Sequence, residues 1–332
     1  MRGKLFSTVV AVATLGMVSY ASAAPVLYIT GRGTTVRTSA DNGATFTTFA
    51  TVTGGQLRGI DATASNVFVN NLNGGADATV RPLLAYNTAG TLLDTATYNN
   101  SGAFNEQPVG AFGGYVYVSN GGPNNVQNVS TSFDGTSFGG ETLTNSDVGN
   151  FQGNNITFAT AGAASYQFLT GTSGTNIRRS TLDGDGTVSS VTGITTSGGP
   201  ADLRDIAFTS SGRLVTIGTT GIFLSAPNQI TSTAIALTSA FTFTGTETAA
   251  TGDLGVNGRD FALIGSDLFA VTDTRVFRYT LDDTNGTLAF VGANLHGFSS
   301  TGVQIAAAVP EPTSLAALAL GGAAMLRRRR TN

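Results

Sequence analysis

The sequence predicts an all-β fold, and three features of its central part lead to that prediction. Residues 24–308 contain no long stretch with a 3.6-residue apolar period, so long amphipathic helices are not expected. Short runs of β-branched and aromatic residues are separated by glycine, asparagine and aspartate, a pattern typical of strands joined by tight turns. Glycine accounts for 44 of the 332 residues, about twice its usual share.

One unit of roughly 48 residues recurs along this region. It has a short first strand, a turn, a second strand, and two further runs joined by a turn of Asp-Gly or Asn-Gly type. The second strand is predicted at 27–30, 67–70, 116–119, 166–169, 213–216 and 268–271. The first strand is predicted at 57–60, 109–112, 156–159, 203–206 and 259–262, and it returns a sixth time at 303–306.

The first unit lacks its first strand, and an extra first strand stands at the end of the region. This offset predicts a closed ring in which the last strand completes the first unit. We therefore expect a β-propeller over 24–308, with six blades of four antiparallel strands closed by pairing of the N- and C-terminal strands. Seven blades are the main alternative, since 238–258 has room for an extra strand pair. A β-helix or a low-complexity stalk is a further alternative, although a stalk should lack aromatics such as Phe68, Phe112, Phe158, Phe208 and Phe261.

The N-terminal segment has the layout of a secretory signal peptide. Positive residues at the start are followed by an apolar stretch over 5–20, and then by small residues at the −3 and −1 positions of a cleavage site, Ala21 and Ala23. We expect signal peptidase to cut after Ala23, which makes 1–23 the signal peptide. A retained membrane anchor is the alternative.

The C-terminal segment, 309–332, has three parts. Pro310, Glu311 and Pro312 come first, an apolar run to Leu326 follows, and four arginines come last: Arg327, Arg328, Arg329 and Arg330. A helix over 313–326 would be about 21 Å long, which is shorter than the hydrocarbon core of roughly 30 Å. Such a transmembrane helix inserts transiently, with its arginines on the cytoplasmic side.

This tripartite tail resembles the PEP-CTERM sorting signal of exported proteins from diderm bacteria that make exopolysaccharide. The resemblance covers about the last two dozen residues and has the family's order of parts. It implies recognition and cleavage near Pro310-Glu311-Pro312 by an exosortase-type peptidase, after transient anchoring in the inner membrane.

Composition excludes several functions. The chain has no cysteine, one histidine and one lysine, Lys4, so thiol nucleophiles, disulfides, cysteine-based zinc sites, lysine Schiff bases and P-loops are ruled out. The terminal segments hold six of the 17 basic residues and one of the 20 acidic ones, so the body carries 11 basic and 19 acidic residues, a net charge of −8. An acidic body without a basic stripe does not favour nucleic acid.

Within the body, residues 39–46 (Ser-Ala-Asp-Asn-Gly-Ala-Thr-Phe) resemble an Asp-box, and 132–138 is a degraded copy. Stretches such as 203–208 with 212–215, and 108–125, are similar to NHL-type six-bladed repeats. We interpret Asp41, Asp134 and Asp183 as structural turn residues. The arginine triad, tyrosine and glutamate that a sialidase also needs cannot be assigned.

Two hairpins, 183–186 and 282–286, contain clustered acids that suggest weak calcium binding as an alternative to ordinary turns. An EF-hand loop starting at Asp183 would need Gly and Glu where Val188 and Ile194 stand. No cofactor is therefore predicted beyond this weak calcium.

Three arginines stand at the same position of the repeat, at the start of the first strand of their units: Arg58, Arg204 and Arg259. An aspartate follows each of them closely in the sequence, namely Asp61, Asp205 and Asp260. If they converge in the channel, they could bind a carboxylated or sulfated sugar. Alternatively, each pairs with a carboxylate and joins neighbouring blades. Glu106 precedes Pro108 at the entry of another blade and faintly resembles the metal-binding Glu-x-Pro of gluconolactonase-type propellers, without the accompanying tryptophan.

No catalytic constellation is identifiable, and His296 has no evident partner. We expect an exported, non-catalytic cell-surface or extracellular-matrix protein that binds partners, including extracellular polysaccharide. The first alternative is a hydrolase or lyase acting on a saccharide in the channel through the arginines with Glu106 or an aspartate. The second is a purely structural coat component without a ligand.

Overall fold

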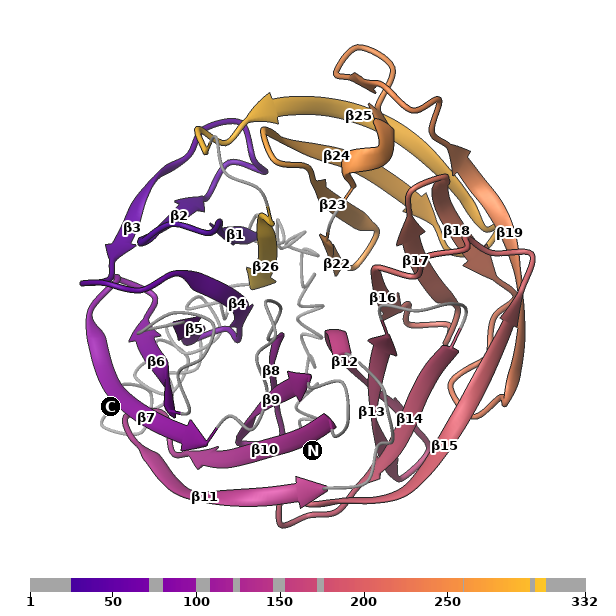
Figure 1. Ribbon diagram of the computed structural model, residues 1–332. Coiled ribbons are helices and arrows are strands. Elements are labelled where there is room, and N and C mark those ends of the chain that lie inside the picture. The colour runs from indigo at the N-terminus through magenta and orange to yellow at the C-terminus, as the bar shows by residue number, and fades with distance from the viewer. Residues whose placement is uncertain are drawn as a thin grey trace, which may run out of the picture. The chain divides into compact units, whose positions relative to one another are not determined.

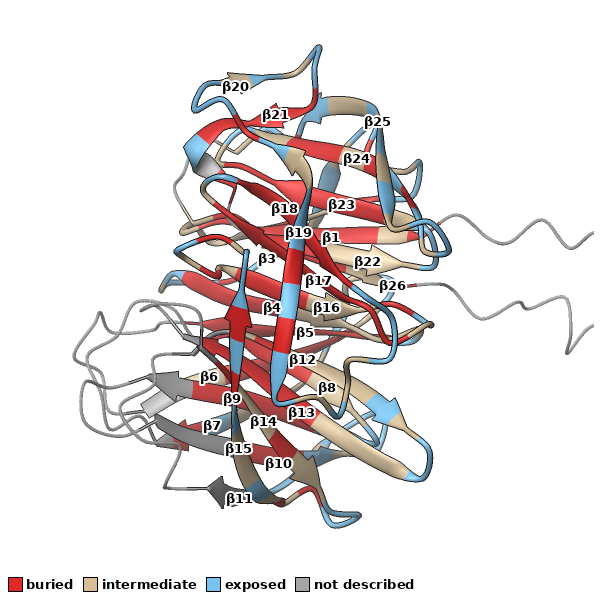
Figure 2. Ribbon diagram, turned by 90° about the vertical axis from the view of Figure 1, so that its right-hand side faces the viewer, coloured by how far each residue is buried: buried red, intermediate tan, exposed pale blue. Residues whose placement is uncertain are grey.

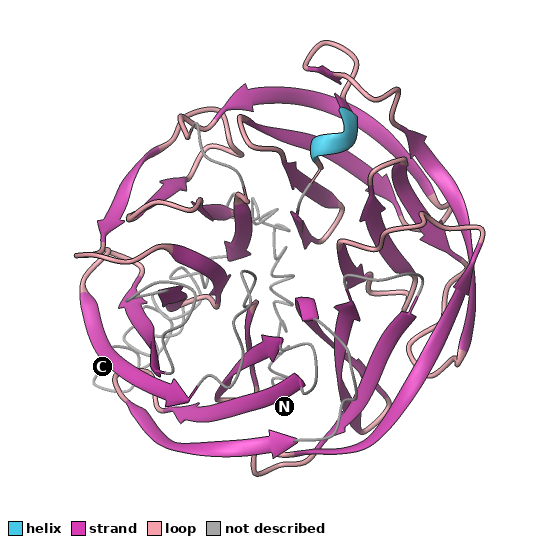
Figure 3. Cartoon of the chain, viewed as in Figure 1, coloured by secondary structure: helices cyan, strands magenta, loops and turns pink. Residues whose placement is uncertain are grey.

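The computed structural model describes residues 25–71, 80–99, 108–121, 126–145, 153–171, 176–258, 260–298 and 302–308. Within these ranges the chain consists of strands and turns, with one 3₁₀ turn, η1 (Gly255–Asn257), which confirms the all-β prediction (Figure 3). The predicted signal peptide and sorting segment lie outside the described residues. In the part that is described, no helix is long and apolar enough to cross a bilayer.

The sheets surround a common centre as propeller blades do (Figure 1). In the described ranges, six groups of four antiparallel strands can be followed, each running from an innermost strand near the centre to an outermost strand at the periphery. From the innermost strand outward they are β26 (Gln304–Ala308), β1 (Val26–Thr30), β2 (Thr35–Ser39), β3 (Thr47–Thr51); β4 (Leu57–Ala62), β5 (Asn66–Asn71), β6 (Val80–Asn87), β7 (Leu92–Asn99); β8 (Val109–Phe112), β9 (Tyr115–Gly121), β10 (Val126–Phe133), β11 (Phe138–Asn145); β12 (Gly153–Ala161), β13 (Ala164–Gly171), β14 (Asn176–Leu182), β15 (Val188–Ser197); β16 (Asp205–Phe208), β17 (Leu214–Gly218), β18 (Gly221–Ser225), β19 (Ala234–Thr242); and β22 (Asp260–Ile264), β23 (Asp267–Val271), β24 (Arg275–Asp282), β25 (Thr287–Leu295).

The ring closes as the sequence predicted. The last strand, β26, pairs antiparallel with the first, β1, so that Tyr28 lies opposite Ala306 and Thr30 opposite Gln304. One blade is therefore made from both ends of the domain, and its backbone hydrogen bonds join residues nearly 280 positions apart.

Two features depart from simple repetition. The outermost strands β15 and β19 pair in parallel through Thr195–Ser197 and Ala234–Ala236, which joins two neighbouring blades into one eight-stranded sheet. The extra strand pair considered within 238–258 exists as a two-residue ladder between β20 (Glu247–Thr248) and β21 (Asp253–Leu254). It leads into η1 and does not form a four-stranded group.

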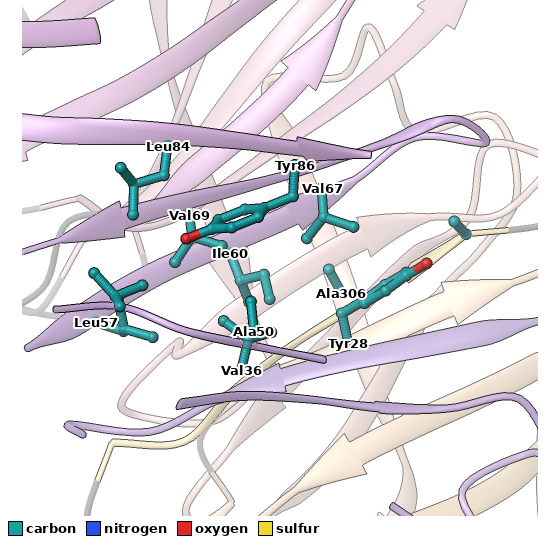
Figure 4. Close-up of a cluster of buried hydrophobic side chains, with 12 residues drawn as sticks. Tyr28, Val36, Ala50, Leu57, Ile60, Val67, Val69, Leu84, Tyr86 and Ala306 are labelled. Carbon is teal, nitrogen blue, oxygen red and sulfur yellow. The ribbon is translucent and has the colours of Figure 1, made fainter. Parts of the chain in front are cut away.

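Burial explains the continuous apolar runs of the second strands. Every residue of the second strands β5 and β17 is buried, as is every residue of the third strand β18, because neighbouring blades cover both faces of these strands (Figure 2). Between the first two blades, Tyr28 and Val36 pack against Val67 and Tyr86 (Figure 4). Phe49 lies edge-on to both tyrosines, with ring centroids 5.0 Å from Tyr28 and 5.9 Å from Tyr86.

The turns that the repeat predicts all lie between the third and the outermost strand of their blades, at 41–43, 87–90, 134–135, 183–186, 227–228 and 282–286. In the Asp-box-like turn, the Asp41 carboxylate accepts hydrogen bonds from the Thr45 backbone N–H at 2.9 Å and from the Ser39 hydroxyl at 2.6 Å. The hydrogen bonds from Ser39 and Thr45 hold the pKa of Asp41 at about 2. Asn42 and Gly43 have positive φ angles of 58° and 81°, which asparagine and glycine tolerate at such turns.

Each outermost strand contains a β-bulge or similar register shift where it pairs with the third strand of its blade. In β25, for example, Gly292 and Phe290 lie opposite consecutive residues of β24, so Val291 has no partner in the ladder. Bulges of this kind bend a strand and increase its local twist.

Candidate functional site

A cavity of about 170 Å³ lies where the innermost strands meet at the centre of the ring. It is smaller than the pockets of roughly 300 Å³ or more that usually hold small organic ligands. All six innermost strands, or the residue directly before them, contribute to its wall. The polar side chains among the lining residues are Asp61, Asn155, Thr157, Asp205, Asp260 and Gln304.

Asp61 connects two blades at this cavity. Its carboxylate accepts a hydrogen bond from its own neighbour, the Ala62 N–H, at 2.8 Å, and one from the Ala111 N–H of β8 at 2.6 Å. The part of its surface that protein does not cover faces the narrow cavity, where water solvates a charge less well than in bulk. Burial therefore raises the pKa of Asp61 to about 7, even though the two N–H groups favour the charged form.

Asp205 and Asp260 repeat this arrangement on the other side of the ring. Asp205 accepts from its neighbour Ile206 at 2.6 Å and from the Phe261 N–H of β22 at 2.7 Å. Asp260, in turn, accepts from the Ile305 N–H of the closing strand at 2.9 Å. The three carboxylates thus join successive innermost strands through backbone hydrogen bonds.

Asp205 and Asp260 also share a hydrogen bond, and the Asn155 side chain donates to Asp260. Asp205 is 1% exposed and Asp260 is 8% exposed. Burial raises the pKa of both carboxyls, and the charge of Asp260 raises that of Asp205 further. A proton is therefore held between them more tightly than in water.

Two oxygens of the same lining are without a donor. The side-chain Oδ1 of Asn155 and Oε1 of Gln304 are buried, and in the described part of the chain neither accepts a hydrogen bond. Buried acceptors are nearly always satisfied by protein, water or an ion. These two oxygens, together with the carboxyl pair, therefore form a set of acceptors with too few donors.

The arginines that the sequence placed near the channel have other roles where they are described. Arg204 forms an ion pair with Asp202 at 3.1 Å and donates to the carbonyls of Val256 and Gly258, at 3.3 and 2.8 Å. It thereby ties its own blade to the segment that leads into the next one. Arg58 is 7% exposed and donates to the Gln56 side chain at 2.7 Å.

Neither Arg58 nor Arg204 is among the residues that line the cavity, whose charged groups are carboxylates. Arg259 and Glu106 lie outside the described residues. The structure therefore brings together the aspartates named as arginine partners, while Arg58 and Arg204 lie outside the cavity lining.

The sequence contained a signal for this cluster. Asn155, Asp205, Asp260 and Gln304 each stand directly before the first apolar residue of an innermost strand, namely Ile156, Ile206, Phe261 and Ile305. A polar residue at the same position in four repeat units indicates that these residues line one cavity. The arginine pattern alone does not carry this signal.

The remaining candidates are satisfied locally. Asp134 accepts from the N–H groups of Thr136 and Ser137, each at 2.8 Å, and Asp183 accepts at longer range from the hydroxyls of Thr187 and Ser189. Within the described ranges, no three acidic or histidine side chains form a group that could hold a metal ion.

His296 is fully buried. Its Nδ1 accepts from the Phe298 N–H at 3.1 Å, so the proton is on Nε2, which donates to the Thr272 carbonyl at 3.1 Å.

Residues 308–330 match the PEP-CTERM protein-sorting motif. The chain is thus an exported protein with a sorting motif of the kind that exosortase recognises. No curated protein matches it in sequence.

Solved structures resemble it in fold. A chain of the nidogen–laminin complex matches with a TM-score of 0.57 at 12% identity, covering 85% of this chain and 98% of that one. A proposed 6-phosphogluconolactonase from Bacteroides fragilis matches with a TM-score of 0.53 at 16% identity, covering 83% of each chain. A functionally unknown protein from Desulfotomaculum acetoxidans matches with a TM-score of 0.51 at 17% identity, covering 82% of this chain and 80% of that one. At such identities the likeness concerns the fold alone.

Proposed function

We propose that this chain is a non-catalytic protein of the cell surface or extracellular matrix, built on a six-bladed, NHL-like propeller that serves as a binding scaffold. The supporting observation is that the sorting motif begins at Ala308, the last residue of the strand that closes the ring. The sorted tail therefore follows a finished domain directly, and cleavage near Pro310 would release the propeller without disturbing a blade.

In this proposal, 1–23 is a signal peptide removed by signal peptidase, 24–308 is the propeller, and 309–332 is the sorting segment. The apolar run and the arginines Arg327 to Arg330 hold the chain in the inner membrane until an exosortase-type peptidase acts. The propeller then reaches the surface or the matrix.

The inner ring supports a scaffold more than a catalyst. Asp61, Asp205 and Asp260 each accept a backbone N–H from the next blade, so their first task is to join strands. We propose that binding, including binding of extracellular polysaccharide, uses the outer surface of the blades.

The sorting step is tested by replacing Pro310, Glu311 and Pro312 with alanine and following the chain by cell fractionation and intact-mass analysis. The unaltered chain should lose its tail and leave the membrane fraction, whereas the variant should stay uncut in that fraction. A matched control replaces the four arginines with lysine, which keeps the positive charge. Equal release of the alanine variant would refute exosortase-type processing.

Binding is tested separately with the processed protein on an array of bacterial polysaccharides. Retention on one class of glycan supports the scaffold, while absence of binding on every glycan favours the structural coat component.

A saccharide hydrolase or lyase is the second candidate, because one observation favours it: a carboxyl whose pKa is raised to about 7 lines a cavity, as general acids do. The acidic wall does not suit a phosphorylated or carboxylated substrate. Turnover of neutral glycosides or lactones that Asp61→Asn abolishes would establish this candidate over the scaffold.

A further inference from the structure

We propose that the central cavity binds a hard divalent cation, with calcium preferred, through the carboxylates of Asp205 and Asp260 and the amide oxygens of Asn155 and Gln304. These four residues are called the cation site below. It is distinct from the acidic hairpins at the periphery, and it does not depend on the proposed function.

The described wall of the cavity is acidic. Three carboxylates face the cavity, and among the described residues that line it there is no basic side chain. Lys4 is the only lysine of the chain, and Arg204 is held by Asp202, Val256 and Gly258. Asp205 and Asp260 share a proton in the cation-free protein, and a bound cation would replace that proton and compensate the charge of both carboxylates.

Two buried amide oxygens of the cavity wall, Asn155 Oδ1 and Gln304 Oε1, accept no hydrogen bond in the described part of the chain. Asn155 uses its amide N–H to donate to Asp260, which fixes the orientation of the amide and leaves Oδ1 as an acceptor without a donor. On the closing strand β26, the Oε1 of Gln304 is likewise buried without a donor. A cation satisfies both oxygens and both carboxylates together, whereas water satisfies the amides but leaves the charge uncompensated.

The type of ligand atom indicates which cation the cavity would bind. All the candidate ligands are oxygens, the chain has no cysteine, and the single histidine is occupied by Thr272 and Phe298. Oxygen-only sets select magnesium or calcium over zinc and copper. Calcium accepts six to eight ligands in irregular geometry, and a cavity of about 170 Å³ leaves room for waters beside four protein ligands.

Asp61 is not assigned as a ligand. In the described residues no three carboxylates form one metal-binding group, so the site depends on two carboxylates completed by two amides. The charge of Asp260 adds to the rise in the pKa of Asp61, whose main cause is burial.

The cation would link four innermost strands, β12, β16, β22 and β26, and the last of these closes the ring. It would therefore reinforce the junction on which the closed ring depends. Sites of modest affinity, with dissociation constants of about 10⁻⁴ to 10⁻³ M, suffice for domains that work outside the cell.

The experiment uses the exported, processed protein after removal of metal with EDTA. Its Tm is measured against calcium, magnesium and, at matched ionic strength, sodium chloride, and calcium binding is measured by isothermal titration calorimetry. Calcium at one hundred times its dissociation constant should raise Tm by about 5 to 10 °C. No shift with any divalent cation, or an equal shift with sodium, would overturn the proposal.

Variants locate the effect. Gln304→Leu removes an unsatisfied oxygen, so the cation-free Tm should stay the same or rise, while calcium affinity falls at least about tenfold. A merely structural role of Gln304 would not separate these two readouts. Asp260→Asn should abolish the calcium shift, and Asp134→Asn, in an exposed turn, is the matched control that should keep it. If Asp260→Asn fails to fold, Gln304→Leu decides alone, and an unchanged calcium affinity in it refutes the site.

Discussion

Asp61 should make the folded state less stable as the pH rises through neutrality, which is the reverse of the usual behaviour of carboxylates. Its pKa is raised from 3.8 to about 7, so the folded chain holds this proton more tightly than the unfolded chain does. The stabilising contribution is complete below pH 3.8, declines as the unfolded state ionises, and is gone above about pH 7. Between pH 5 and pH 7.5 the loss in unfolding free energy is about 2.5 kcal/mol.

The assay is urea denaturation at constant ionic strength across this pH range, comparing the unaltered chain with Asp61→Asn. The amide cannot ionise, so the variant should lack this part of the pH dependence, and the difference between the two curves isolates Asp61 from the other titrating groups. Asp94→Asn is the matched control, because Asp94 accepts from Thr95 and from Phe138 of the neighbouring blade, both at 2.8 Å, away from the central cavity.

A difference curve that is flat, or that grows in favour of the unaltered chain with rising pH, would show that Asp61 is ionised in the folded state. In that case the two backbone N–H groups, rather than burial, would determine its protonation.

Three further perturbations test individual contacts. Tyr279→Phe removes the hydroxyl that donates to the Gly252 carbonyl, so unfolding free energy should fall by about 1 to 2 kcal/mol and hydrogen exchange around β21 should accelerate. Arg204→Met should lower Tm by about 2 to 6 °C in thermal denaturation, more than Arg278→Met, whose partner Asp267 lies in the neighbouring strand of its own blade. Burial lowers the pKa of His296 below 6.5. Its contribution to stability is therefore complete above pH 6.5 and is lost as the pH falls through the folded pKa. In the proton NMR spectrum, the single imidazole signal should titrate at a lower pH in the folded chain than in the unfolded chain.

Much of the fold could be predicted because the relevant signals are local and repeated. Each second strand is a short run of residues buried on both faces, and each turn has residues that favour tight reversal, as at Asn42 and Gly43. The closing pair of β1 and β26 followed from counting alone, since one unit lacked a strand and another strand was left over. The pairing of β15 with β19 could not be predicted, because it joins uncharged strands without any sequence mark of the contact.

The site was only partly predictable. The sequence named Asp61, Asp205 and Asp260, but as partners of arginines. In the structure Asp205 and Asp260 instead accept backbone N–H groups of their neighbours, while Arg204 turns toward carbonyls beyond its strand. Side-chain direction at the start of a short strand depends on the twist of the blade and on where the next blade lies, and neither can be read from composition or spacing.

The register shift in each outermost strand opposes edge-to-edge pairing between copies of the protein. The outermost strands of the blades have few charged residues that would repel another copy, and β25 has none. If these strands were regular, their unpaired backbone N–H and C=O groups could pair with those of another copy, edge to edge. Bending the strand at Val291 and its counterparts interrupts that template at least once per blade. A densely packed layer can thus remain an array of separate discs instead of fusing into fibres.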